Sequence, residues 1–114
     1  MEKKDIINNL SLEFRRGTLV LLTLALLREP KYGYALVQEM EALDIAIDQS
    51  TLYPLLRRLE TQEVLASSWD TETTKPRKYY VLTPFGEVIL SELEKQWIAL
   101  TKNTNKVLGG KDNE

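Results

Sequence analysis

The chain has 114 residues, which suits one domain with a single small core. It contains no cysteine and no histidine, which removes disulfides, thiolate metal sites, cysteine nucleophiles and the commonest general base. The net charge of −2 does not indicate a nucleic-acid-binding protein, so any prediction of DNA binding must rest on where the charges lie. We therefore expect no enzyme, no cofactor and no metal site.

The sequence has no pattern of a signal peptide or of a membrane span. Lys3 and Lys4 are followed by Asp5 rather than by an apolar run. The apolar stretch 19–27 is too short to cross a bilayer, which takes about 20 residues. We expect a cytoplasmic protein with no membrane partner.

Apolar residues recur at steps of three and four in the first half of the chain, a spacing typical of helices. The spacing predicts helices over residues 6–28, 33–43 and 50–62. Pro30 ends the first helix. Proline has no backbone N–H, and only in the first turn of a helix does this cost no hydrogen bond. We therefore expect Pro54 to lie in the first turn, with Ser50 or Thr51 as the cap of the third helix.

The second half of the chain predicts a hairpin and one long helix. Strands are expected over residues 64–69 and 77–82, with the polar stretch 70–76 as the hairpin tip. The last helix starts at Thr83-Pro84, a capping residue followed by proline, and continues to about residue 108. At 1.5 Å per residue this helix is roughly 37 Å long, more than a domain of this size can cover.

This order of elements predicts a winged helix-turn-helix, a mainly α fold with a small β hairpin and a long C-terminal dimerisation helix. The expected divisions are a DNA-binding domain at 1–82, the dimerisation helix at 83–108 and a disordered tail at 109–114.

The third predicted helix has an apolar back and a polar front. Leucines at 52, 55, 56 and 59 share one face, and at about 100° per residue the polar residues fall on the other. Guanidinium groups bond guanine, and hydroxyls bond bases or phosphates, so this front suits a DNA groove. An ordinary amphipathic helix with solvated arginines is the alternative. The candidate DNA contacts here are Ser50, Thr51, Tyr53, Arg57, Arg58 and Thr61.

Two further groups are candidates for contact with the DNA backbone. The predicted hairpin carries Lys75, Arg77 and Lys78 at or next to its tip, where flexible cations reach phosphates. Asp70 and Glu72 in the same loop favour the alternative, a hairpin kept soluble by its charges. Tyr32 and Tyr34 open the second helix, whose amino end suits a phosphate; core packing is the alternative for both. Gly33 between them permits an unusual turn.

The last helix carries an apolar stripe that one small domain cannot bury. We expect it to pack on the first helix of a second copy, giving a homodimer. The predicted dimer contacts are Ile6, Leu10, Phe14, Val88, Ile89, Leu93, Trp97 and Leu100.

Three segments together resemble the PadR family of transcriptional regulators. They are Lys31-Tyr32-Gly33-Tyr34-Ala35-Leu36, then Ser50-Thr51-Leu52-Tyr53-Pro54-Leu55-Leu56-Arg57-Arg58-Leu59-Glu60, then Arg77-Lys78-Tyr79-Tyr80-Val81-Leu82-Thr83-Pro84-Phe85-Gly86. The resemblance covers roughly residues 12–97 and implies a winged-helix repressor that dimerises through its last helix. It also implies that some members release DNA when a small aromatic or drug-like molecule binds.

The chain departs from this family at Glu63, where such proteins usually carry glycine. Glycine suits a left-handed helix end and glutamate does not, so either Glu63 accepts strain or the turn differs.

The sequence thus predicts a dimeric repressor of a double-stranded DNA operator. A winged-helix module that binds proteins and not DNA is the alternative. Trp97 and Phe14 are the candidate contacts of a small aromatic effector at the dimer centre, although plain core packing is the commoner role of such residues.

Overall fold

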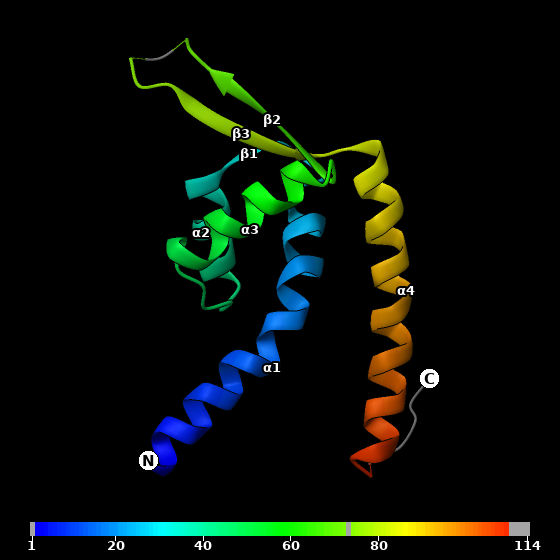
Figure 1. The fold of residues 1–114 in the computed structure, drawn as a ribbon. Helices are drawn as coiled ribbons and strands as arrows, with labels where there is room; N and C mark the ends of the chain where they lie inside the picture. The colour runs from blue at the N-terminus through cyan, green and yellow to red at the C-terminus, as the bar shows by residue number, and fades with distance from the viewer. Residues whose placement is uncertain (1, 73, 110–114) are drawn as a thin grey trace.

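The computed structural model describes residues 2–72 and 74–109, in which the winged helix-turn-helix is complete (Figure 1). The elements are α1 (Lys3–Leu26), β1 (Lys31–Tyr32), α2 (Gly33–Ala42), α3 (Gln49–Thr61), β2 (Leu65–Asp70), β3 (Arg77–Leu82) and α4 (Pro84–Val107). The predicted fold class is confirmed, and the predicted bounds of β3 match the observed ones. Of the predicted disordered tail, only Gly109 lies within the described residues.

The hairpin of β2 and β3, here called the wing (residues 65–82), gains a third short strand that the sequence did not predict. β1 pairs antiparallel with β3, with Lys31 opposite Tyr80 and Tyr32 opposite Tyr79, so the sheet order is β1-β3-β2. On the other side of β3 the register runs from Leu65 opposite Leu82 to Asp70 opposite Arg77. The short strand therefore ties the start of α2 to the wing.

The core lies where α1, α2 and α3 meet the base of the wing and the start of α4. The four leucines of α3 that share one face are all buried, which is the arrangement that their spacing predicts. The buried apolar residues are Leu24, Leu27, Leu36, Val37, Met40, Leu52, Leu55, Leu56, Leu59, Val64, Leu65, Tyr80, Leu82 and Leu90. This back face fixes α3, so its front can face outward.

Both helices of the helix-turn-helix end in the same left-handed turn. Glu63 has a φ of 64°, and the Val64 N–H donates to the Leu59 carbonyl at 2.9 Å. Asp44 has a φ of 62°, and the Ile45 N–H donates to the Met40 carbonyl at 2.8 Å. These are Schellman turns, which normally place glycine at the left-handed residue. Glu63 therefore accepts the strained conformation, and the turn keeps its usual geometry.

The predicted cap of α3 at Ser50 or Thr51 is wrong. The cap is Asp48, whose carboxylate accepts from the Thr51 N–H at 3.0 Å and from the Ser50 hydroxyl at 2.6 Å. Both hydrogen bonds hold the pKa of Asp48 below its usual value. Pro54 consequently lies past the first turn of α3. Because proline has no backbone N–H, the carbonyl of Ser50 receives no helical hydrogen bond from it. Ser50 is an exposed residue.

The predicted start of α4 is confirmed. Thr83 is the cap, Pro84 is the first helical residue, and the Thr83 hydroxyl accepts from the Gly86 N–H at 2.9 Å. Gly86 leaves no room for a side chain, because a Cβ there would lie 2.3 Å from the Val64 carbonyl oxygen. The turn after α3 and the first turn of α4 are thus packed backbone to backbone.

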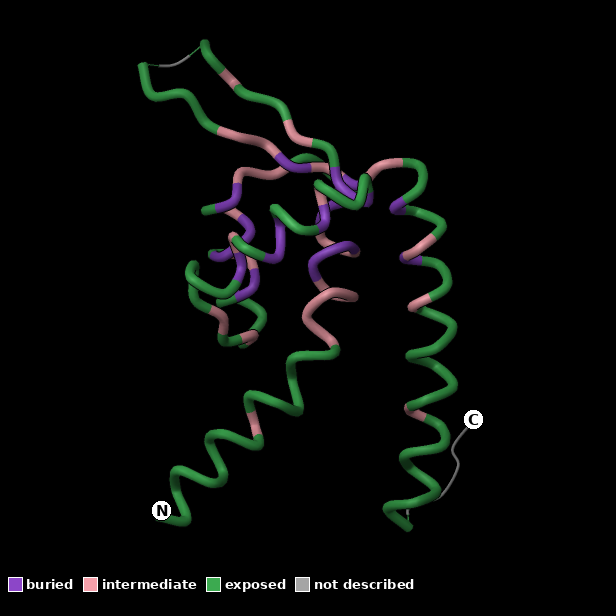
Figure 2. The backbone as a smooth tube through the Cα atoms, in the orientation of Figure 1, coloured by how far each residue is buried: buried purple, intermediate pink, exposed green. Residues whose placement is uncertain are grey.

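The outer halves of α1 and α4 extend beyond the core on the side away from the wing. Figure 2 shows both halves exposed over most of their length, and Figure 1 shows them diverging from each other. Their exposed apolar residues include Ile6, Leu10, Phe14, Trp97, Ile98 and Leu100. Among the described residues, no helix combines the length and the apolar character that crossing a membrane requires.

Candidate nucleic-acid interface

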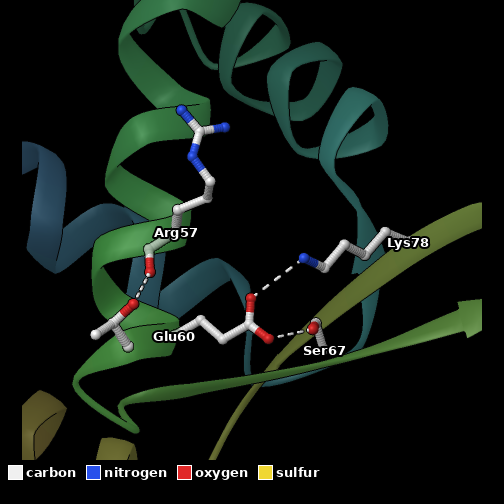
Figure 3. A network of polar contacts seen from close by, with 5 residues as sticks. Arg57, Glu60, Ser67 and Lys78 are labelled. Carbon is white, nitrogen blue, oxygen red and sulfur yellow. Dashed lines mark hydrogen bonds and ion pairs between the residues drawn. The ribbon is translucent and has the colours of Figure 1, made fainter.

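The front of α3 presents polar side chains that the buried leucines hold outward. Ser50, Arg57 and Thr61 are all exposed. The Thr61 hydroxyl donates to the Arg57 carbonyl at 3.0 Å, so its lone pairs face out while its proton is used within the helix. Among the described residues, no carboxylate pairs with the Arg57 guanidinium, which extends away from the helix in Figure 3. This front can donate to a groove without first breaking an ion pair.

The two flanks of α3 face different surroundings. Tyr53 and Glu60 lie seven residues apart on the flank that meets the wing and the start of α2. Thr51 lies on the other flank and lines a groove beside α1 and the connection between α2 and α3. Arg58 also belongs to this second flank, exposed in the last turn of the helix. The two adjacent arginines therefore do not share one direction, and Arg57 is the one at the centre of the front.

The three cations of the wing have different surroundings. Lys75 is exposed at the hairpin tip. The Arg77 guanidinium lies over the Tyr32 ring, 4.9 Å from its centroid, and stays exposed. The Lys78 ammonium lies 3.3 Å from the Glu60 carboxylate and is only partly exposed. The sequence named all three as candidate phosphate contacts, and the structure gives each of them different surroundings.

The two tyrosines at the start of α2 also differ. The rings of Tyr32 and Tyr79 stack at 4.0 Å between centroids, and the Tyr79 hydroxyl donates to the Tyr32 hydroxyl at 2.6 Å. Tyr32 in turn donates to the Asp70 carboxylate at 3.0 Å. The hydrogen bond from Tyr79, desolvation and the hydrogen bond to Asp70 raise the pKa of Tyr32 to about 12, so this phenol stays protonated. Tyr34 is 58 % exposed and is the tyrosine left for a ligand.

Gly33 serves a close approach and not the unusual turn that we expected. It is the buried first residue of α2, and its φ is outside the left-handed region. A Cβ there would lie 2.5 Å from Cε1 of Tyr53. The missing side chain lets the Tyr53 ring lie against the start of α2, which brings α3 close to that helix end.

A recess of about 590 Å³ opens between the start of α2, the wing-facing flank of α3 and the wing itself. Aromatic, cationic and amide side chains line it, among them Tyr34, Gln38, Tyr53, Trp69 and Arg77. Sequence reasoning missed Trp69 and Gln38, because only the folding of the wing over α2 brings them there. The recess lies beside the amino end of α2, where the cap residue Tyr32 makes no side-chain hydrogen bond to the helix, and a helix end of this kind suits an anion.

The predicted dimer residues divide into exposed and half-buried groups. Ile6, Leu10 and Phe14 on α1 and Val88, Trp97 and Leu100 on α4 are exposed. Ile89 and Leu93 instead pack on the core of their own chain, so they are only partly available to a partner. Val88 precedes Trp97 by nine residues, which places the two on opposite sides of α4.

The described residues contain no group of three or more acidic side chains arranged to hold a metal ion. The fold is that of a winged helix-turn-helix protein. It has the two short helices α2 and α3, a hairpin within a small three-stranded sheet, and an outward basic face on α3.

Comparison with known proteins gives the family. The model of the transcriptional regulator PadR-like family matches residues 21–92 of this chain. A crystal structure of a PadR family transcriptional regulator from Eggerthella lenta DSM 2243 aligns with a TM-score of 0.86 and 52 % identity, covering 92 % of this chain and 94 % of that one. The chain belongs to the PadR-like family of transcriptional regulators, which bind DNA operators and are not enzymes.

Two curated proteins are similar to this chain in sequence. An uncharacterised protein from Lysinibacillus sphaericus is 38 % identical over 87 residues, which are 72 % of this chain and 80 % of that protein. A transcriptional regulator of Mycobacterium tuberculosis is 34 % identical over 79 residues, which are 69 % of this chain and 71 % of that protein.

Proposed function

We propose that the protein is a sequence-specific repressor that binds its operator as a homodimer in the cytoplasm. The observation that carries this proposal is the front of α3, where Arg57 is exposed beside the exposed residues Ser50 and Thr61 and pairs with no carboxylate of the described residues. A guanidinium in this position can bond the O6 and N7 acceptors of guanine in the major groove. The four buried leucines on the opposite face prevent α3 from rotating about its own axis.

The amino end of α2 and the wing are the elements that hold the DNA backbone. The amino end of α2, the exposed Tyr34 ring and the cationic recess beside them suit a phosphate. Lys75 and Arg77 extend this surface along the wing. Contacts of this kind fix register and add salt-dependent affinity, while α3 selects the sequence.

A two-fold dimer places two copies of α3 on one side of the duplex. The operator is then roughly palindromic, with half-sites about one helical turn apart. The exposed apolar residues on the outer halves of α1 and α4 support a second copy as the partner.

The test is binding of the purified protein to a duplex from upstream of its own gene, measured by fluorescence anisotropy over a range of salt concentrations. Arg57→Ala should weaken operator binding by roughly 1–3 kcal/mol and relax specificity. Arg58→Ala is the matched control, because it removes the same group from the flank of the same helix, and it should weaken binding less. Equal binding by the parent and Arg57→Ala would contradict the placement of α3 in the groove.

We further propose a small aromatic effector bound between the two copies. Trp97 is 44 % exposed and Phe14 is 84 % exposed, and both lie on the outer halves of the helices that we assign to the dimer. Two facing indoles can stack a planar molecule, and a cationic one gains further attraction from the rings. Such a ligand would favour a dimer whose two α3 helices no longer match the spacing of the half-sites.

Titration of planar aromatic compounds against tryptophan fluorescence tests this effector site. Trp69→Phe in an otherwise unchanged chain leaves Trp97 as its one tryptophan. Trp97→Ala retains only Trp69, so binding to that variant is measured by calorimetry. Trp97→Ala should lose the binding of compounds that quench the parent. Unchanged affinity in a folded Trp97→Ala dimer would remove the indole from the site.

A further inference from the structure

Glu60 joins the recognition helix to both strands of the wing. One oxygen of its carboxylate accepts a hydrogen bond from the Ser67 hydroxyl on β2, and the other lies 3.3 Å from the Lys78 ammonium on β3 (Figure 3). Glu60 lies on the wing-facing flank of α3, three residues after Arg57. One carboxylate therefore contacts three elements that together form the DNA-facing surface.

The surroundings of this contact distinguish it from an ordinary surface ion pair. The side chains of Glu60 and Lys78 are 34 % and 30 % exposed, whereas those of the pair Arg28 and Glu87 are more than half exposed. The Lys78 ammonium also lies 5.3 Å from the centroid of the Tyr80 ring. The hydrogen bond from Ser67 and the charge of Lys78 lower the pKa of Glu60, so the carboxylate is ionised. Partial burial reduces the screening that makes exposed pairs weak.

The two residues that Glu60 contacts lie at different positions along the wing. Ser67 lies two residues into β2, near the base of the wing. Lys78 pairs with Trp69 and is one register position from Arg77 and Asp70, the last pair before the tip. A carboxylate that holds both the base and the outer part of the wing limits how far the wing can swing away from α3.

We propose that Glu60 is a positioning residue for DNA recognition, which fixes the angle of the wing to α3 and neutralises Lys78, so that Lys78 makes no phosphate contact. This inference rests on the proposed function, because it assumes that α3 and the wing bind one duplex together. A neutralised wing lysine adds no sequence-blind affinity, which suits a chain with a net charge of −2 whose specificity lies on α3. Glu60 thereby raises the ratio of operator binding to non-specific binding.

The first experiment measures the dependence of log K on log salt for the operator and for an unrelated duplex. Glu60→Gln frees Lys78, so the salt slope should steepen by about 1, the affinity for unrelated DNA should rise severalfold, and the specificity ratio should fall. Lys78→Met should leave the salt slope unchanged while it weakens operator binding through the loosened wing. Lys75→Met is the matched control, since it removes one lysine charge at the exposed tip.

The double variant Glu60→Gln with Lys78→Met separates charge from shape. It should lose the steeper slope of Glu60→Gln, because the lysine that would cause it is gone. A slope that falls by about 1 in Lys78→Met would show that Lys78 contacts a phosphate and would overturn the proposal. An unchanged specificity ratio in Glu60→Gln would overturn it as well.

A second experiment needs no DNA and keeps this inference separate from the proposed function. The shifts of the urea midpoint caused by Glu60→Gln and by Lys78→Met should not add in the double variant, because each removes the same contact. Additive shifts would contradict the contact itself. A parent protein that binds no duplex while the shifts are non-additive would contradict the proposed function and the DNA role of Glu60, and would leave the contact as part of the fold.

Discussion

All residues of the buried apolar core lie in the body of the molecule, residues 18–93, whereas the apolar side chains of its two arms, residues 3–17 of α1 and 94–107 of α4, are in contact with solvent. Within the arms only Ser11 and Thr101 are even half-buried. Both arms belong to helices that continue into the body, so α1 and α4 each have one part packed on the core and one part exposed to solvent. A single chain therefore closes its winged-helix core and leaves a second apolar surface uncovered.

This contrast assigns separate tasks to the two regions. The body carries the surface that we propose to face DNA, and its apolar core is formed by contacts within one chain. The arms carry exposed apolar residues such as Leu10, Phe14 and Trp97, whose burial needs a partner. Substitutions in the two regions should therefore have different consequences.

Leu24 and Leu10 compare the two regions within one helix. Leu24 is 0 % exposed in the body and Leu10 is 58 % exposed in the arm. Leu24→Ala should lower the free energy of unfolding by roughly 2–5 kcal/mol, measured by urea denaturation. Leu10→Ala should instead raise the dissociation constant of the dimer about tenfold, measured by sedimentation, through lost apolar burial. An unchanged dissociation constant in Leu10→Ala would remove this arm from the interface.

Gly86 and Gly17, which lie inside α4 and α1, give opposite expectations. An alanine Cβ at Gly86 would meet the Val64 carbonyl oxygen at 2.3 Å, so Gly86→Ala should destabilise the body by roughly 1–3 kcal/mol. Gly17 in the arm has nothing within 4 Å of such a Cβ, so Gly17→Ala should stabilise the helix by up to about 1 kcal/mol. Thermal unfolding of both variants checks the pair, and destabilisation by Gly17→Ala would mean that the arm is tightly packed.

Thr23 and Thr101 compare a hydroxyl in the body with one in the arm. The Thr23 side chain is fully buried and its oxygen has no hydrogen-bond partner among the described residues. Thr23→Val removes this desolvated group and should stabilise by about 1 kcal/mol in chemical denaturation. Thr101 donates to the Trp97 carbonyl at 2.8 Å, so Thr101→Val should change stability by less than about 0.5 kcal/mol. A loss of stability in Thr23→Val would point to a hydrogen bond made by that hydroxyl.

The smallest expected effect is at the left-handed turns. Glycine adopts a φ near 64° without the Cβ strain that Glu63 bears, so Glu63→Gly should stabilise by up to roughly 1 kcal/mol. Asp44→Gly should gain less, because aspartate tolerates this conformation better than glutamate does. Urea midpoints of the two variants make the comparison, and a destabilised Glu63→Gly would mean that the glutamate side chain contributes more than the strain costs.

Local signals in the sequence were sufficient for most of the fold. The periodicity of the leucines placed the back of α3, and Thr83-Pro84 marked the start of α4, since capping and helical spacing depend only on neighbouring residues. The same kind of reasoning set the cap of α3 two residues too late, because Pro54 was assigned to the first turn. The missing glycine at Glu63 correctly indicated a strained turn as one of two outcomes.

Contacts between distant segments could not be predicted in this way. The strand β1 has two residues and exists only because Lys31 and Tyr32 pair with β3, so it has no periodicity of its own. The contact of Glu60 with Lys78 depends on the direction in which the wing folds over α3. Helical spacing places Glu60 on a flank, but the tertiary structure decides what that flank meets. The role of Gly33 was missed for the same reason, because the close ring belongs to Tyr53.

The central claim is that the arms are completed by a second copy of the chain. Multi-angle light scattering of the full chain at micromolar concentration tests it most directly. The account predicts a mass of twice the 13.1 kDa of one chain, and an unfolding midpoint that rises with protein concentration. A mass of one chain, with a midpoint independent of concentration, would contradict it and would mean that the arms remain uncovered in solution.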